Sequence, residues 1–336
     1  MQNDYLLNVK HLTTRFHTPR GVAHAVNGVS FGMYPGEILG VVGESGCGKS
    51  VTAQSVMRLI PEPPGRIEKG EILFGGMDLA ALTLRQMRKI RGDRISMIFQ
   101  EPMTSLNPLK TVGKQIGEVY ALHRGVSKKE SLDKAMEMLE KVQVPEARRR
   151  VTEYPHQLSG GMRQRVMIAM ALACDPEILI ADEPTTALDV TVQAQIMDLM
   201  LKLQDQHKTA IMMITHDLGI IAEMANRVVV MYAGRIVESA STRVLFHETG
   251  HPYTKGLMNS VPVIGAKDAA GNSRLTEIPG MVPSLYELPE GCSFAPRCPH
   301  QNKRCRTELP PLFTVSPGHD VRCWLCESAC EKGAVA

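Results

Sequence analysis

The stretch from residue 43 to residue 50 constrains the fold of this chain more than any other. It reads Gly43-Glu44-Ser45-Gly46-Cys47-Gly48-Lys49-Ser50. This order fits the phosphate-loop pattern G-x-x-x-x-G-K-[ST], which needs a strand before it and a helix after it. The apolar run 37–42 predicts a buried strand, and apolar residues at helical spacing over 51–60 predict the helix. The sequence therefore predicts a nucleotide-binding α/β fold.

The chemistry of this loop follows from its backbone and its last two side chains. Glycines let successive N–H groups face phosphate oxygens at the positive end of a helix. Lys49 would then carry its charge to the β- and γ-phosphates, and Ser50 would offer its hydroxyl to Mg²⁺. We expect the thiolate form of Cys47 to be favoured by the helix start and by Lys49, the alternative being an inert, buried cysteine.

Ring-bearing side chains near the amino terminus are candidates for contact with an adenine base. Phe16 and His24 fall within residues 5–35, which read as short strands with a turn near residues 18–21. Each is equally well explained as an ordinary strand residue.

Polar residues follow three further apolar runs that we interpret as core strands. Gln100 follows the run 95–99, and from there it could reach the metal or the attacking water. Asp182 and Glu183 end the run 177–183, where Asp182 would hold Mg²⁺ and Glu183 would polarise water against the γ-phosphate. His216 follows the run 210–214 and could sense the γ-phosphate. Each of these residues, taken alone, also fits an ordinary surface or structural role.

A second glycine-containing helix start lies at residues 158–165. Ser159 is a good N-cap residue, and Gly160 and Gly161 offer backbone N–H groups to a phosphate. One nucleotide rarely needs two such helix starts from one chain. We therefore expect this segment to serve a nucleotide held by a second, similar chain, the alternative being a helix cap without a ligand.

Composition limits the class of protein. A net charge of +3 over 336 residues gives no argument for a nucleic-acid partner. The longest apolar run, residues 166–174, is far too short to span a membrane, and residues 1–5 do not resemble a signal peptide. We expect a soluble, cytosolic protein that meets a membrane only through a partner.

The carboxyl-terminal part differs in composition from the rest. Six of the eight cysteines lie after residue 291, and ten of the 21 prolines lie between Pro252 and Pro317. These changes predict a boundary near residue 250, with an ATPase domain at 1–250 and an extension at 251–336. Four prolines lie in the segments that link Cys292, Cys298, Cys305 and Cys323. We expect these segments to be loops that bury little apolar surface and need a staple.

The order of these motifs resembles that of the ATP-binding subunit of an ABC transporter. The resemblance identifies residues 43–50 as the Walker A loop, Gln100 as the Q-loop residue, residues 158–164 as the signature motif and Asp182 as the end of the Walker B strand. It makes Glu183 the catalytic carboxylate, residues 187–189 the D-loop and His216 the switch histidine. The fold it implies is a RecA-like α/β core with an antiparallel β subdomain and an inserted helical subdomain at about 101–165.

A narrower resemblance is to the oligopeptide/dipeptide (peptide/nickel) importers, carried by residues 100–108, 251–254 and 291–299. It implies pairing with a related ATPase, two transmembrane permease subunits, and an external substrate-binding protein. The chain would then lie at the cytoplasmic face of the membrane and energise uptake of dipeptides or oligopeptides. Nickel, glutathione or another small ligand remains an alternative cargo.

The cysteine cluster allows more than one interpretation. Its members Cys292, Cys298, Cys305 and Cys323 suit either zinc or an iron–sulfur cluster. The importer resemblance favours a structural 4Fe–4S cluster, with Cys326 as an alternative fourth ligand, over zinc and over free or oxidised thiols. Two functions of other classes stay open: a soluble ABC ATPase without a membrane partner, and a redox protein in which the ATPase is secondary.

Overall fold

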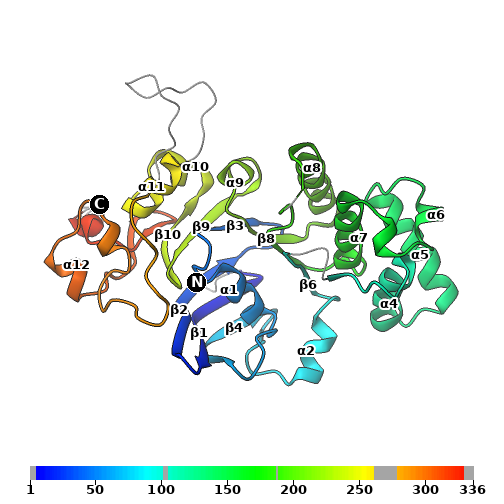
Figure 1. The fold of residues 1–336 in the computed structure, drawn as a ribbon, viewed down its shortest axis with the longest axis horizontal. Coiled ribbons are helices and arrows are strands. Elements are labelled where there is room, and N and C mark those ends of the chain that lie inside the picture. Colours follow the sequence, from blue (N-terminus) through cyan, green and yellow to red (C-terminus); the bar gives the residue numbers. More distant parts are fainter. Residues whose placement is uncertain (1–4, 101–104, 187, 261–277, 329–336) are drawn as a thin grey trace. The chain divides into compact units, whose positions relative to one another are not determined.

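The computed structural model describes residues 5–100, 105–186, 188–260 and 278–328. The chain divides into two compact units (Figure 1). Unit 1 combines residues 1–6, 33–38 and 81–214, and unit 2 combines residues 7–32, 39–80 and 215–336.

Unit 1 contains three parallel strands whose carboxyl ends carry the polar candidates. These are β6 (Ile95–Ile98), β7 (Ile178–Asp182) and β8 (Ala210–Ile214). The register pairs Ile98 with Ala181 and Asp182 with Ile214. Strands β7 and β8 are buried along their whole length, as expected for a parallel sheet covered on both faces. All three confirm the strands predicted from apolar runs.

Helices make up much of the described part of unit 1, and two of them begin at a serine N-cap, of which Ser159 was predicted. Ser127 accepts a hydrogen bond from the N–H of Glu130, and Ser159 accepts one from the N–H of Met162, so each caps a helix. Helix α4 packs against α5, and both pack against α7 (Figure 1). The helices of unit 1 are α2 (Leu84–Ile90), α4 (Val112–Arg124), α5 (Lys128–Lys141), α6 (Ala147–Arg150), the 3₁₀ helix η1 (Pro155–Gln157), α7 (Gly160–Leu172) and α8 (Val190–His207).

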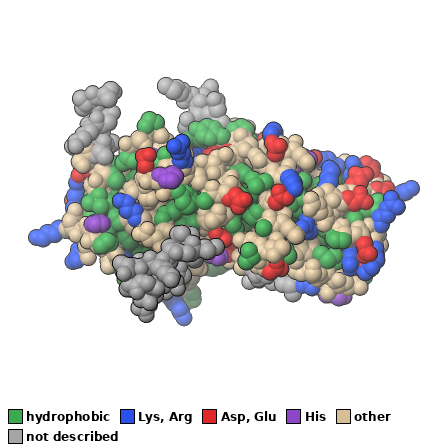
Figure 2. Space-filling model, turned by 90° about the horizontal axis from the view of Figure 1, so that it is seen from above, with side chains coloured by type: hydrophobic (Ala, Val, Ile, Leu, Met, Phe, Trp, Pro, Cys, Tyr) green, Lys and Arg blue, Asp and Glu red, His purple; other side chains and the backbone are tan. Residues whose placement is uncertain are grey.

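Charged side chains of both signs are interspersed over the part of unit 1 that holds α4 to α6 (Figure 2). Within it, Arg149 and Arg150 each form ion pairs with Glu146 and Glu153. These acidic and basic side chains therefore offset one another on this part of the surface.

Unit 2 contains a four-stranded antiparallel arrangement in the order β2-β1-β4-β5. The predicted turn near residues 18–21 joins the first two strands, and β4 and β5 complete the arrangement. The strands are β1 (Leu7–Thr18), β2 (Gly21–Met33), β4 (Gly65–Phe74) and β5 (Met77–Asp78).

A second set of strands in unit 2 links the phosphate loop to the carboxyl-terminal segment. Strand β3 (Ile38–Val42) runs parallel to β9 (Arg227–Tyr232), which forms a hairpin with β10 (Arg235–Ser241). Beyond β10 come β12 (His319–Val321) and then β11 (Phe313–Ser316), each antiparallel to its neighbour. Carboxyl-terminal strands thus extend the sheet that positions the phosphate loop.

Short helices complete unit 2. They are α1 (Lys49–Val56), α9 (Leu218–Met224), α10 (Thr242–His247), α11 (Pro252–Asn259), η2 (Ala295–Arg297), α12 (Lys303–Thr307) and η3 (Trp324–Cys326). No helix among the described residues is both long and apolar enough to cross a membrane.

The prediction that the segments linking Cys292 to Cys323 are loops with little buried apolar surface is wrong. Val321 is fully buried beside Cys323 and Cys326, and Phe313 packs against this cluster. Phe294 is also buried, within a group of aromatic rings formed by Tyr232, His251 and Tyr253. Strand pairing and aromatic packing therefore hold the described part of the extension. The domain boundary near residue 250 stays a prediction.

Candidate nucleotide site

The phosphate loop of unit 2 depends on glycine at positions where a side chain has no room. At Gly43, with φ of 150°, a Cβ atom would lie 2.2 Å from the carbonyl oxygen of Met231. At Gly48, with φ of 99°, it would lie 2.3 Å from the carbonyl oxygen of Ala25. Because both neighbours are backbone atoms, they cannot turn aside as a side chain can. The two glycines thus fix the path of the chain into helix α1.

Lys49 is the first residue of α1, and its side chain is only 5% exposed. Its Nζ donates to the carbonyl oxygens of Gly43, at 2.7 Å, and Glu44, at 3.1 Å. Helix α1 has no side-chain cap, since Gly48 occupies the N-cap position. The start of the helix therefore presents backbone N–H groups and a lysine to the same loop, as an anion-binding site requires.

The expectation of a thiolate at Cys47 is wrong. Its side chain is fully buried, and this burial raises the pKa of the thiol even though the charge of Lys49 acts to lower it. Withdrawal from water penalises the charged form more strongly than the neighbouring ammonium favours it. The inert, buried cysteine is the interpretation that the structure supports.

Cys47 should react slowly with maleimide, because a buried neutral thiol is a poor nucleophile. Cys305, which is only partly buried, should react faster in the same native sample. Peptide mapping by mass spectrometry after timed labelling measures both rates. Labelling of Cys47 as fast as that of Cys305 would contradict this assignment.

The strand ends of unit 1 bring two of the predicted polar residues into direct contact. Glu183 follows β7, and its Oε2 accepts hydrogen bonds from Nε2 of Gln100, at 3.0 Å, and from Oγ1 of Thr186, at 2.9 Å. Asp182, one residue earlier, is only 3% exposed. Thr186 was not predicted as a site residue, although its place three residues after Glu183 in the turn following the strand is a usable signal.

The backbone at Glu183 is unusual. Its φ of 47° lies in the left-handed region that residues with a side chain rarely adopt. The N–H of Glu183 donates to the carbonyl oxygen of Ile214, at 2.8 Å, which helps to hold this conformation. Strain of this kind costs about 1 kcal/mol or more and is found chiefly where function requires a set orientation.

The predicted second phosphate-binding helix start lies in unit 1 at α7. Ser159 and Gly160 are exposed, whereas Gly161 approaches α8 closely. A Cβ atom on Gly161 would lie 2.8 Å from Cγ1 of Val192. Glycine at 161 therefore has a packing reason in addition to the predicted role in phosphate binding.

Two further candidates belong to unit 2. His216 is exposed and follows β8 at the start of the segment that leads to α9. Phe16 lies half-buried on β1 opposite Gly65, and a Cβ atom on Gly65 would lie 2.9 Å from its ring. Residues 101–104 and 187, in the predicted Q-loop and D-loop, and Cys330 lie outside the described residues.

Comparison with known proteins assigns the family. The chain is 56% identical over 321 residues to a probable peptide ABC transporter ATP-binding protein of Sinorhizobium fredii, covering 96% of this chain and 95% of the relative. It belongs to the ABC transporter family. A dipeptide transport ATP-binding protein of Bacillus subtilis is 48% identical, with 98% of each chain covered. The profile of the ABC transporter family matches residues 26–186.

A second profile, the oligopeptide/dipeptide transporter C-terminal region, matches residues 237–305. Among solved structures, an ATP-binding cassette dimer in a post-hydrolysis state, bound to ADP and Pi, has a TM-score of 0.64 and 29% identity. That likeness covers 70% of this chain and 99% of the cassette. The predicted ABC cassette fold is confirmed.

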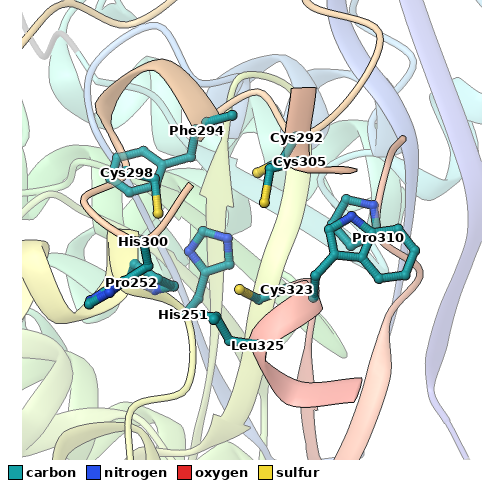
Figure 3. Close-up of a pocket in the computed structure, with 12 residues that line it drawn as sticks. His251, Pro252, Cys292, Phe294, Cys298, His300, Cys305, Pro310, Cys323 and Leu325 are labelled. Atoms are coloured by element: carbon teal, nitrogen blue, oxygen red, sulfur yellow. The ribbon is translucent and has the colours of Figure 1, made fainter. Parts of the chain in front are cut away.

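The predicted 4Fe–4S cluster of this family member is wrong. The thiols of Cys292, Cys298, Cys305 and Cys323 line one pocket beside the ring of His251 (Figure 3). Nevertheless, no three His, Cys, Asp or Glu side chains among the described residues form a group that could hold a metal ion. Burial raises the pKa of the thiols of Cys292 and Cys298, and that of Cys323 to about 12, so the metal-free thiols are neutral.

His251, at the edge of this pocket, gives the ABC protein a predictable response to acid. Its Nδ1 accepts the N–H of Tyr253, which caps α11, and its buried Nε2 has no hydrogen-bond partner among the described residues. Burial lowers the pKa of His251 from 6.5 to about 4. The unfolded chain therefore takes up this proton first as the pH falls, and the folded state loses stability between about pH 6.5 and pH 4.

The free energy of unfolding should fall by about 3 kcal/mol over this pH range. The urea midpoint measures this loss when it is followed against pH by the fluorescence of Trp324, the sole tryptophan. His251→Asn keeps a capping acceptor and removes the titration, so its midpoint should change less over this range. His247→Asn, at an exposed histidine, is the matched control and should behave as the wild type. Equal pH dependence of all three proteins would refute the assignment.

Proposed function

We propose that this chain binds MgATP, hydrolyses it, and thereby drives peptide import through partner membrane subunits. The single observation that carries the hydrolytic part is the carboxylate of Glu183, held by Gln100 and Thr186 at the end of β7. Membership of the ABC transporter family supports ATP as the nucleotide. The names of the relatives and the match of the C-terminal profile support peptides as the cargo.

Each part of the proposed site has a separate task. The loop 43–50 and Lys49 would hold the phosphates, Phe16 would contact the adenine, and His216 would respond to the γ-phosphate. Glu183 would accept a proton from the attacking water, and the hydrogen bond from Gln100 would keep its carboxylate in one orientation. Catalysis of this kind relies on positioning and charge, since the phosphoryl group needs no covalent help.

Each unit offers oxygen atoms of the kind that Mg²⁺ prefers. Asp182 is a buried carboxylate at a strand end, and Ser50 has a hydroxyl directly after the loop lysine, both being the oxygen ligands that Mg²⁺ prefers. Gln100 adds an amide oxygen at another strand end. When bound with the nucleotide, Mg²⁺ would neutralise charge that develops on the phosphates.

The partners follow from the two helix starts. Ser159, Gly160 and Gly161 would bind the γ-phosphate of a nucleotide held by a second, related ATPase, so that two nucleotides join the pair. Two transmembrane permease subunits would receive the motion at the inner face of the membrane, and an external substrate-binding protein would deliver the peptide. Nickel, glutathione or another small ligand is the alternative cargo. The match of the C-terminal transporter region disfavours a soluble ABC ATPase without membrane partners.

The decisive experiment is reconstitution. The chain, co-expressed with its partner ATPase and permease subunits, should support ATP-dependent uptake of a labelled dipeptide into proteoliposomes. Lys49→Ala should abolish that uptake while the complex still assembles. ATP hydrolysis without any peptide stimulation or uptake, together with stimulation by another ligand class, would refute the peptide assignment.

A further inference from the structure

An arginine of the carboxyl-terminal extension reaches the phosphate loop within unit 2. Arg297 and Glu44 lie 253 residues apart in sequence. Nη1 of Arg297 donates to Oε2 of Glu44 at 2.7 Å, and Nη2 donates to Oε1 at 3.0 Å. This is the two-point geometry in which a guanidinium and a carboxylate bind each other most strongly. The side chain of Arg297 is 5% exposed, and that of Glu44 is 25% exposed.

The guanidinium is itself held on its other sides. It donates to the carbonyl oxygens of Ile278 and Pro279, each at 3.0 Å, and to the hydroxyl of Tyr232 at 3.3 Å. Its carbon lies 5.8 Å from the ring centres of both Tyr232 and Phe294. An arginine with this many contacts has a fixed position. Its pKa is raised, chiefly by the hydrogen bonds to Glu44, so its charge persists at any working pH.

The extension also holds the backbone of Glu44. The N–H of Glu44 donates to the hydroxyl of Tyr253 at 2.8 Å, and Tyr253 is fully buried in α11. On its carbonyl side, Glu44 accepts a hydrogen bond from Lys49. One residue of the loop is thus bound through its N–H group, its carbonyl and its side chain.

The charge of Glu44 explains why such a partner matters. A carboxylate on a loop that holds a triphosphate repels the ligand unless a cation offsets it. Lys49 cannot serve both ligand and carboxylate, because it is the group that would carry its charge to the phosphates. Arg297 is the cation that contacts the Glu44 carboxylate in the described part of the chain.

We propose that Arg297 is a positioning residue for nucleotide binding, which neutralises Glu44 and so lets the phosphate loop accept a triphosphate. The inference rests on the proposed function, since it presumes that this loop binds ATP. The carboxyl-terminal extension would then contribute a residue to the nucleotide site. The nucleotide affinity of the chain should then depend on a residue far outside the loop motif.

The test is a double-mutant cycle on the full chain, with a fluorescent, non-hydrolysable ATP analogue and Mg²⁺ as the probe. Arg297→Ala should weaken binding at least about tenfold, as expected for one uncompensated charge near the phosphates. Glu44→Gln alone should bind the analogue more tightly than the wild type does, because the charge of Arg297 is then unopposed beside the phosphates. The double variant should return to within about threefold of the wild type, because no carboxylate is left to neutralise.

Two controls separate charge from folding. Arg304→Ala removes an arginine of the same extension that pairs with Glu308 and Glu327, and it should leave affinity unchanged. If Arg297→Ala does not fold, Arg297→Gln is compared with Arg297→Gln combined with Glu44→Gln. Failure of the wild type to bind the probe would refute the proposed function. Normal binding by the wild type with no loss in the Arg297 variants, or no recovery when Glu44 is also changed, would overturn this inference alone.

Discussion

Glu183→Gln should slow ATP hydrolysis by at least about a hundredfold while ATP binding stays close to that of the wild type. The amide keeps the size of the side chain and can still accept from Thr186 and Gln100, so the turn after β7 should be preserved. It cannot take a proton from water, however, and the general-base contribution is lost. Because the variant binds ATP but hydrolyses it slowly, it should accumulate as the nucleotide-bound pair of ATPase subunits.

The measurement is phosphate release by the assembled transporter, with the partner ATPase disabled so that only this site turns over. Glu177→Gln is the matched control, since Glu177 lies just before the same strand and pairs with Arg94 at the surface. We expect the control to hydrolyse ATP as the wild type does. Near-normal turnover by the Glu183 variant would remove Glu183 from the catalytic role.

Local patterns predicted most of the elements, because short-range signals set them. The capping hydroxyl of Ser159, the apolar runs of β7 and β8, and the turn between β1 and β2 all depend on neighbours in sequence. The helix after the phosphate loop was predicted too long. It ends at Val56, although apolar residues continue to residue 60.

The extension was predicted poorly because its contacts are distant in sequence. Strand β12 pairs with β10, which lies about eighty residues earlier in the sequence. The three residues of β12 are too few to form a periodic pattern that predicts this pairing. The phosphate-loop motif does not predict the contact between Arg297 and Glu44 either, since the motif allows any residue at position 44. The cysteines of the extension led to the prediction of a metal cluster, whereas the packing of Phe294 and the pairing of β12 hold this segment in place.

The contact among Glu183, Gln100 and Thr186 was only partly predictable, because it depends on the order of the strands. The sequence placed Gln100 and Glu183 at separate strand ends, and the parallel order of β6 and β7 brings those ends together. Thr186 became meaningful only through its hydrogen bond to the carboxylate. A positive φ at Glu183 could not be anticipated, because glutamate carries no preference for that region.

Glu238→Gln should lower the free energy of unfolding of unit 2 by about 3 kcal/mol, the effect expected when one member of a buried pair is removed. Glu238 has no exposed surface, and its carboxylate accepts from Nε2 of His319, at 2.8 Å, and from the N–H groups of Gly250, at 2.7 Å, and His251, at 2.9 Å. It thus ties β10 to the start of α11 and to β12. Burial acts to raise the pKa of Glu238, but these hydrogen bonds outweigh it, so the pKa is lowered.

Because the pKa of Glu238 is lowered, its contribution to the free energy of unfolding is complete above the pKa of an ordinary carboxyl group. That contribution is lost as the pH falls through the lowered pKa of Glu238. The loss on substitution should therefore be largest at neutral pH and shrink in strong acid, where the wild type is itself protonated. Urea unfolding followed by the fluorescence of Trp324 measures it, since η3, which contains Trp324, lies close after β12 in sequence. Glu248→Gln removes the same charge from an exposed position nearby and should leave the midpoint unchanged. Equal midpoints for the two variants would show that the buried carboxylate does not hold the extension, and the packing of Phe294 and Val321 would then have to account for its stability.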